Sequence, residues 1–161
     1  MPPATVRSIE PSLPPLHTLT WVSLNASTAG SVTVTPRMAV QLLASAPGER
    51  VLHGDLHHDN IVSAQRAPWL AIDPKGVVGD PGFETGALMN NPYGRMETWT
   101  APAQHFSRRA AILAERLAYP HERILAWSYT QAVLSACWEV IAGTVRYGSW
   151  VARAEVLAPL L

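Results

Sequence analysis

The chain has 161 residues and a mass of 17.5 kDa, and its 48% of hydrophobic residues suffices for the core of one ordinary domain. Twelve Lys and Arg balance twelve Asp and Glu, which argues against nucleic acid or an anionic membrane surface as the main partner. The single cysteine excludes an intrachain disulfide and a multi-cysteine zinc site. No stretch matches a signal peptide or a membrane span, so we expect a cytoplasmic protein.

Residues 1–37 differ in composition from the rest of the chain. Five of the fourteen prolines lie within the first fifteen residues, and no charged residue stands between Glu10 and Arg37. This composition predicts a poorly ordered lead-in with one β-prone piece at residues 31–34. We therefore place the folded domain at residues 38–161.

From Pro36 onward, periodic hydrophobic patterns alternate with turn residues. Val51-Leu52 and residues 69–72 flank a polar segment and are expected to form strands, the second of them buried. Asp80 is a candidate helix cap, followed by proline at the first helical position. Helices are expected over residues 36–46, 80–91, 107–118 and 122–142. The pattern predicts an α+β fold with a mainly helical C-terminal half.

The segment from His53 to Asn60 carries most of the recognisable chemistry. Asp55 and Asn60 have the H-x-D-x-x-x-x-N spacing of a kinase catalytic loop, and Asp73 follows the next predicted strand. A kinase site needs a carboxylate for the proton of the attacking hydroxyl and oxygen ligands for Mg²⁺ on the nucleotide phosphates. We expect Asp55 to be the base and Asn60 and Asp73 to bind the metal. His53 is expected to support the loop by hydrogen bonding rather than to react.

The same segment permits a zinc site as an alternative. His53 and His57 are four residues apart and would share one face of a helix. Gly54 and the flanking strands argue against a helix at this place. The kinase interpretation is therefore preferred.

The run His53–Asn60, together with residues 72–76 and 79–81, closely resembles the streptomycin kinase branch of the aminoglycoside phosphotransferases, the aminoglycoside and hydroxyurea resistance kinases. The resemblance covers about residues 39–143. It implies a protein-kinase-like fold of two lobes, with ATP and Mg²⁺ as cofactors and an antibiotic hydroxyl, streptomycin's first of all, as acceptor. It also implies that Asp80 braces the catalytic loop.

Two glutamates are candidates for supporting the site or contacting the substrate. Glu84 lies on the helix that follows the metal loop, although a solvated helix face is the commoner position for such a residue. A pocket for a polycationic aminoglycoside should present carboxylates. Glu139 is a candidate for that contact, with an exposed helix face again the commoner role. The aromatic residues Trp127, Tyr129 and Trp138 are expected in the core.

The nucleotide-gripping half of a kinase is not recognisable in this sequence. No glycine-rich loop and no strand with an anchoring lysine precede His53, and the one lysine, Lys75, follows the metal-binding aspartate. Residues 73–76 replace the Asp-Phe-Gly of protein kinases, which favours a small-molecule substrate. We expect a C-terminal catalytic lobe without its N-terminal lobe, which could be encoded separately. Two functions stay open: an aminoglycoside phosphotransferase, and a non-catalytic remnant that has lost nucleotide binding.

Overall fold

The computed structural model of the chain describes residues 36–161. The predicted lead-in up to residue 35, with its β-prone piece at residues 31–34, lies outside the described residues. None of the helices in the described part is long and apolar enough to cross a membrane.

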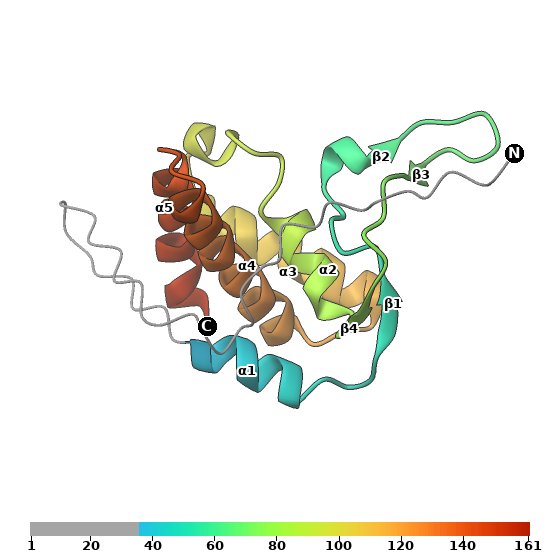
Figure 1. The fold of residues 1–161 in the computed structure, drawn as a ribbon, viewed down its shortest axis with the longest axis horizontal. Coiled ribbons are helices and arrows are strands. Elements are labelled where there is room, and N and C mark those ends of the chain that lie inside the picture. Colours follow the sequence, from blue (N-terminus) through green and yellow to red (C-terminus); the bar gives the residue numbers. More distant parts are fainter. Residues whose placement is uncertain (1–35) are drawn as a thin grey trace, which may run out of the picture.

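The described part consists mainly of helices, with two small sheets. The helices are α1 (Pro36–Ala44), α2 (Gly82–Met89), α3 (Pro102–Leu117), α4 (His121–Ile141) and α5 (Tyr147–Leu157). The strands are β1 (Arg50–Leu52), β2 (Ile61–Val62), β3 (Leu70–Ala71) and β4 (Val77–Gly79). Strand β1 pairs antiparallel with β4, and β2 pairs antiparallel with β3. The β2–β3 hairpin projects from one side of the helical body (Figure 1). A mixed, mostly helical fold is therefore confirmed.

The observed helices differ from the predicted ones in two places. Helix α3 begins at Pro102 rather than at residue 107, because proline fits the first turn, where its missing N–H costs nothing. Helix α5 was not predicted at all. Gly148 near its start weakens the helical pattern after Gly143, whose φ of +69° ends the preceding helix.

The predicted buried strand at residues 69–72 was wrong in its burial. Only Leu70 and Ala71 pair with β2, while the side chains of Trp69 and Ile72 are exposed. Because the two-stranded hairpin projects from the body, no other helix or strand of the described part covers either of its faces. Continuous hydrophobicity therefore did not indicate burial here.

Helix α4 lies at the centre of the helical body. It packs against α1, α2, α3 and α5. The core around it contains the fully buried side chains of Phe106, Ile124 and Leu157. Trp127 is buried as predicted, whereas Trp138 is exposed, which corrects the expectation that it belongs to the core. Helix α4 is buried on several sides rather than along one face, and it thus organises the fold through hydrophobic burial.

Helix α2 approaches α4 so closely that two of its positions have room only for glycine. A Cβ atom at Gly82 would lie 2.3 Å from Cδ1 of Trp127. One at Gly86 would lie 2.9 Å from the Trp127 carbonyl oxygen and from Cβ of Gln131. Any side chain there would force the two helices apart.

A buried carboxylate ties the helices together at the start of α2. Asp80 is 1% exposed, and its Oδ1 accepts a hydrogen bond from the Gly82 N–H at 2.8 Å. The same carboxylate accepts hydrogen bonds from the side chains of Tyr119, Arg123 and Trp127. Burial alone would raise the pKa of Asp80, but these donors outweigh it and lower the pKa. Burial and the bond to Asp80 raise the pKa of Tyr119 to about 12.

Arg123 extends this network to α1. Its guanidinium donates to the Ser45 hydroxyl at 2.9 Å and to the Leu42 carbonyl. One ion pair, Asp80–Arg123, therefore connects three helices that are far apart in the sequence. Removal of either partner would leave a buried charge unpaired.

Candidate functional site

The loop between β1 and β2 lies against the segment that joins β3 to β4. Gly54 has a φ of +82°, and a Cβ atom there would lie 3.0 Å from Cγ2 of Val77 and 3.2 Å from Cβ of Lys75. Only glycine fits both the left-handed backbone and this close approach. The glycine of the motif therefore lets the two segments touch.

Hydrogen bonds from His53 and Lys75 join the two segments. His53 Nε2 lies 2.7 Å from the Ile72 carbonyl oxygen, and its Nδ1 accepts from the Asp55 N–H at 3.3 Å. These partners require the ring to carry its proton on Nε2. The Lys75 N–H donates to the His53 carbonyl at 2.7 Å. His53 thus lies where it can hold the loop, and its ring nitrogens are both occupied.

This arrangement brings together the three residues expected to carry the chemistry. Asn60 is buried, and its Nδ2 donates to the Asp55 carbonyl at 2.9 Å, which leaves its Oδ1 as the group still available to bind. Asp73 has a φ of +56°, and its side chain is 68% exposed. Lys75 Nζ lies 2.9 Å from Asp73 Oδ2 and 3.7 Å from Asp55 Oδ2. The hydrogen bond between Lys75 and Asp73 lowers the pKa of Asp73 and raises that of Lys75.

The oxygen atoms of Asn60 and Asp73 suit a hard divalent cation such as Mg²⁺, which prefers carboxylate and carbonyl oxygens and keeps several waters. Within residues 36–161, no group of three or more His, Cys, Asp and Glu side chains is arranged to hold a metal ion. In the loop itself, His57 Nε2 lies 3.8 Å from Asp55 Oδ1, and His57 Nδ1 accepts a hydrogen bond from the Asp59 N–H at 3.3 Å. The donor set therefore fits magnesium better than the zinc alternative.

The structure corrects the interpretation of Glu84 as a solvated residue. Its Oε1 accepts a hydrogen bond from the Gly54 N–H at 2.8 Å, and its Oε2 is buried without a hydrogen-bond partner among the described residues. Asp80, which was expected to brace the loop, has its side-chain partners in the helices and at Tyr119 instead. The direct contact from α2 to the loop between β1 and β2 is therefore made by Glu84.

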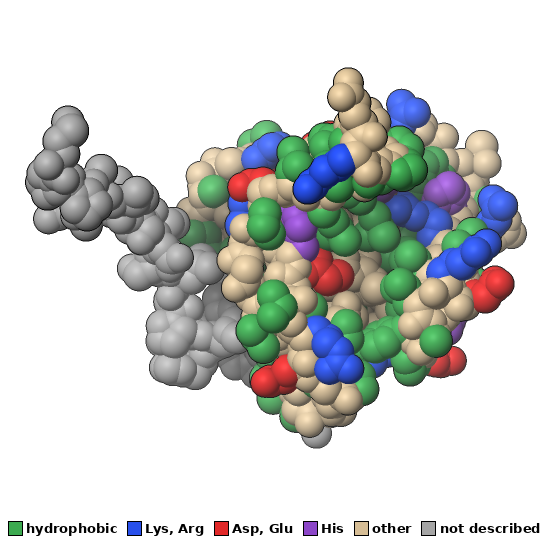
Figure 2. Space-filling model, turned by 90° about the vertical axis from the view of Figure 1, so that its right-hand side faces the viewer, with side chains coloured by type: hydrophobic (Ala, Val, Ile, Leu, Met, Phe, Trp, Pro, Cys, Tyr) green, Lys and Arg blue, Asp and Glu red, His purple; other side chains and the backbone are tan. Residues whose placement is uncertain are grey.

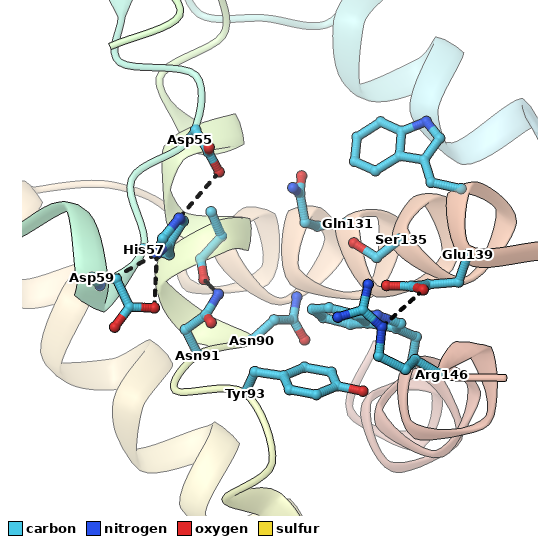
Figure 3. A pocket seen from close by; sticks show the side chains of 13 residues that line it. Asp55, His57, Asp59, Asn90, Asn91, Tyr93, Gln131, Ser135, Glu139 and Arg146 are labelled. Atoms are coloured by element: carbon cyan, nitrogen blue, oxygen red, sulfur yellow. Dashed lines mark hydrogen bonds and ion pairs between the residues drawn. The ribbon is translucent and has the colours of Figure 1, made fainter. Parts of the chain in front are cut away.

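A pocket of about 320 Å³ lies beside Asp55. Asp55, His57 and Asp59 lie on one side of it, and Glu139 and Arg146 lie on the other (Figure 3). Besides these five, the lining consists of side chains from α2, α4, α5 and the segment after α2: Ala87, Asn90, Asn91, Tyr93, Gln131, Ser135, Trp138 and Trp150. Carboxylates, amides and aromatic rings therefore surround the space next to the candidate base.

Glu139 faces this pocket, so its interpretation as a residue of an exposed helix face was wrong. Its side chain is 15% exposed, and its Oε2 accepts from Arg146 Nε at 3.2 Å and from the Thr144 hydroxyl. The hydrogen bond from Thr144 lowers the pKa of the Glu139 carboxyl. The opposite wall of the pocket is thus an ion pair of Glu139 and Arg146.

Sequence reasoning missed most of this wall. Arg146 and Trp150 follow Gly143, where no helix was predicted, and Asn90 and Asn91 carry no recognisable motif. The one signal available was the unusual pair of asparagines directly before a proline. It indicates a turn but not what the turn faces.

A second pocket, of about 470 Å³, lies between α1, the β1–β4 sheet and α4, and it is almost entirely apolar. The face of the molecule seen in Figure 2, in contrast, mixes hydrophobic side chains with acidic, basic and histidine ones. The polar pocket beside Asp55 is therefore the one whose lining suits a charged or hydroxylated ligand.

The family model described as aminoglycoside/hydroxyurea antibiotic resistance kinase matches residues 10–143. The chain belongs to this family. Streptomycin 6-kinase of Streptomyces griseus is 38% identical over 121 residues, which cover 74% of this chain and 39% of that kinase. Hydroxyurea phosphotransferase of Kitasatospora aureofaciens is 39% identical, with 33% of its length covered, and streptomycin 3''-kinase of Klebsiella pneumoniae is 30% identical, with 50% covered. No solved structure matches the chain.

The chain thus spans a third to a half of the length of these kinases. The matched residues include the whole loop from His53 to Asn60 and the segment around Asp73.

Proposed function

We propose that the chain is the catalytic lobe of a small-molecule kinase, which transfers the γ-phosphate of ATP to a hydroxyl group of an aminoglycoside. The observation that carries the proposal is the position of Asp55. It lines the pocket, its carbonyl accepts a hydrogen bond from Asn60, and the ammonium group of Lys75 lies near both its carboxylate and that of Asp73. An acceptor hydroxyl and a metal-bound phosphate would meet at this carboxylate.

The residues suggest a simple division of work. Asp55 would orient the acceptor hydroxyl and take its proton as the hydroxyl oxygen attacks phosphorus. Asn60 Oδ1 and the Asp73 carboxylate would hold Mg²⁺, which neutralises phosphate charge when bound. His53 and Glu84 would keep the loop in place through their bonds to Ile72, Asp55 and Gly54.

Streptomycin is the first acceptor to test. The pocket volume of about 320 Å³ lies within the usual range of small-molecule sites, roughly 300–1,000 Å³. Asp59 supplies a carboxylate for guanidinium or ammonium groups, and Glu139 supplies a second one, which a ligand cation would share with Arg146, whereas the small, neutral hydroxyurea needs neither. The relatives named for streptomycin and for hydroxyurea make both compounds necessary arms of the assay.

The test is phosphate transfer from labelled ATP to streptomycin, measured for the chain alone and with the N-terminal part of a related kinase supplied in trans. Asp55→Asn should lower the rate by roughly 10²- to 10⁴-fold, the usual contribution of a general base. Glu49→Gln, at an exposed position before β1, serves as the control. Transfer by Asp55→Asn at the parental rate would exclude Asp55 as the base. Transfer to hydroxyurea alone would exclude the aminoglycoside acceptor.

Calorimetry with Mg-ATP separates this proposal from a non-catalytic remnant. Saturable nucleotide binding that Asp73→Asn weakens supports a working site. No binding, with or without the added N-terminal part, would leave the remnant as the better description.

A further inference from the structure

Lys75 is the one lysine of the chain, and its ammonium group lies between the two carboxylates of the site. Nζ is 2.9 Å from Asp73 Oδ2 and 3.7 Å from Asp55 Oδ2. A cation therefore stands close to where the metal ligand and the candidate base meet.

The backbone of Lys75 is fixed, whereas its side chain is not. The Lys75 N–H is bonded to the His53 carbonyl, and the next residue, Gly76, has a φ of +64°. The side chain is 51% exposed, and lysine carries its ammonium group on a flexible stem of four carbons. The ammonium can thus change partners while its attachment to the loop stays in place.

We propose that Lys75 is a charge placeholder at this site. Without a divalent cation it neutralises Asp73 and Asp55; when the cation binds Asp73, the ammonium leaves that carboxylate and contacts the phosphoryl group in transfer. The last step rests on the proposed function. No bond to Lys75 forms or breaks: the acceptor oxygen bonds to phosphorus, its proton goes to Asp55, and the bond to the leaving phosphate oxygen breaks.

Electrostatics supports both positions of Lys75. Two carboxylates that face one space repel each other unless a cation lies between them, and either an ammonium group or a metal ion supplies that charge. Once a metal ion replaces it at Asp73, the ammonium stays near Asp55, which would hold the acceptor hydroxyl as its oxygen attacks phosphorus. A compact ammonium group is a common binder of phosphate oxygens.

Binding of Mn²⁺ without nucleotide tests the placeholder directly in the full chain. Mn²⁺ has an electron spin resonance signal that disappears on binding. Lys75→Met should bind Mn²⁺ about two- to fivefold more tightly than the parent, on the scale of one exposed ion pair. Asp73→Asn should bind it more weakly. Arg66→Met, which removes an exposed cation from the turn between β2 and β3, should bind it like the parent.

The outcomes are separable from those for the proposed function. Unchanged or weaker Mn²⁺ binding by Lys75→Met would overturn the placeholder, and so would the absence of Mn²⁺ binding in every variant. Thermal unfolding of Lys75→Met at the parental temperature excludes misfolding as the cause. If Asp55→Asn loses phosphate transfer while Lys75→Met binds Mn²⁺ like the parent, the kinase proposal stands and the placeholder is refuted.

The second position of Lys75 is tested in the reconstituted transfer assay. Lys75→Met should lower kcat by at least about tenfold with KM for the acceptor unchanged, because the contact would form only with the phosphoryl group in transfer. Lys75→Arg keeps the charge and should recover part of kcat. Equal kcat values for the parent and Lys75→Met would exclude this contact.

Discussion

The segment between β1 and β4 and the helical body hold their charged groups in opposite ways. In the segment, the side chains of Asp59, Asp73 and Lys75 are exposed, and a backbone hydrogen bond from Lys75 to His53 holds the main chain but not the side chains. In the body, the carboxylate of Asp80 is buried, and both of its oxygens accept hydrogen bonds. The exposed groups can exchange their present partners for ligands, whereas the buried carboxylate keeps its set of hydrogen-bond donors.

Helix α2 is where these two regions meet. Its start belongs to the Asp80 network, and one turn later Glu84 contacts the loop at Gly54. Disturbance of the body should therefore reach the loop through α2. Four changes should sharpen the contrast between the two regions, here in order of decreasing expected effect.

Asp80→Ala should remove most of the stability of the helical body. The change leaves Arg123 without its buried partner and leaves the side-chain donors of Tyr119 and Trp127 unmatched. We expect the free energy of unfolding in urea to fall by about 3–5 kcal/mol. Asp59→Ala, at a side chain that is 94% exposed, should change it by less than about 0.5 kcal/mol. Similar losses for both variants would contradict the contrast between the two regions.

Gly86→Ala tests the close packing of α2 on α4. The new methyl group would meet the Trp127 carbonyl and Gln131, so the variant should lose about 1–3 kcal/mol in urea unfolding. Gly148→Ala is the matched control in α5, where a Cβ atom meets nothing within 4 Å. There the higher helix propensity of alanine should add up to about 1 kcal/mol. If the free energy of unfolding falls for Gly86→Ala and rises for Gly148→Ala, the loss at Gly86 comes from packing.

Glu84→Gln tests whether α2 supports the loop. The substitution keeps an acceptor for the Gly54 N–H but removes its charge, and charged acceptors form the stronger hydrogen bonds. Under the proposed function we expect phosphate transfer to fall about tenfold, equivalent to roughly 1.4 kcal/mol, in the reconstituted assay. Glu115→Gln, at an exposed position on α3, should transfer at the parental rate. Equal rates for both variants would mean that the loop holds itself.

Acid should weaken the body through Asp80. Because the folded state lowers the pKa of Asp80 below that of an unfolded aspartate, about 3.9, its contribution is complete above that value and is lost as the pH falls through the folded pKa. Urea unfolding between pH 7 and pH 3 should show a shallower loss for Asp80→Asn than for the parent, by at most about 1.4 kcal/mol per pH unit. Tyr119→Phe, which removes one donor, should lie between them. Parallel curves would show that the acid sensitivity originates elsewhere.

The sequence predicted the parts of the site that are local in the chain. Asp55, Asn60 and Asp73 could be found because a short loop and an adjacent strand end bring them together, whatever packs around them. The contact of Glu84 with Gly54 spans 30 residues, and no spacing rule connects them. The position of Glu139 in the pocket could be predicted only from which face of α4 is covered. That depends on α5, whose helical pattern was too weak to predict.

The composition of the pocket wall has a consequence for substrate change over evolution. Apart from Asp55, His57 and Asp59, the wall comes from α2, α4, α5, Arg146 directly before α5, and the turn at Asn90, none of which carries Asn60 or Asp73. Under the proposed function, substitutions at positions such as Tyr93 or Arg146 could alter which antibiotic is accepted and leave the phosphate-transfer groups untouched. Under that function, single substitutions in the wall would change the acceptor specificity of the kinase without altering how it transfers phosphate.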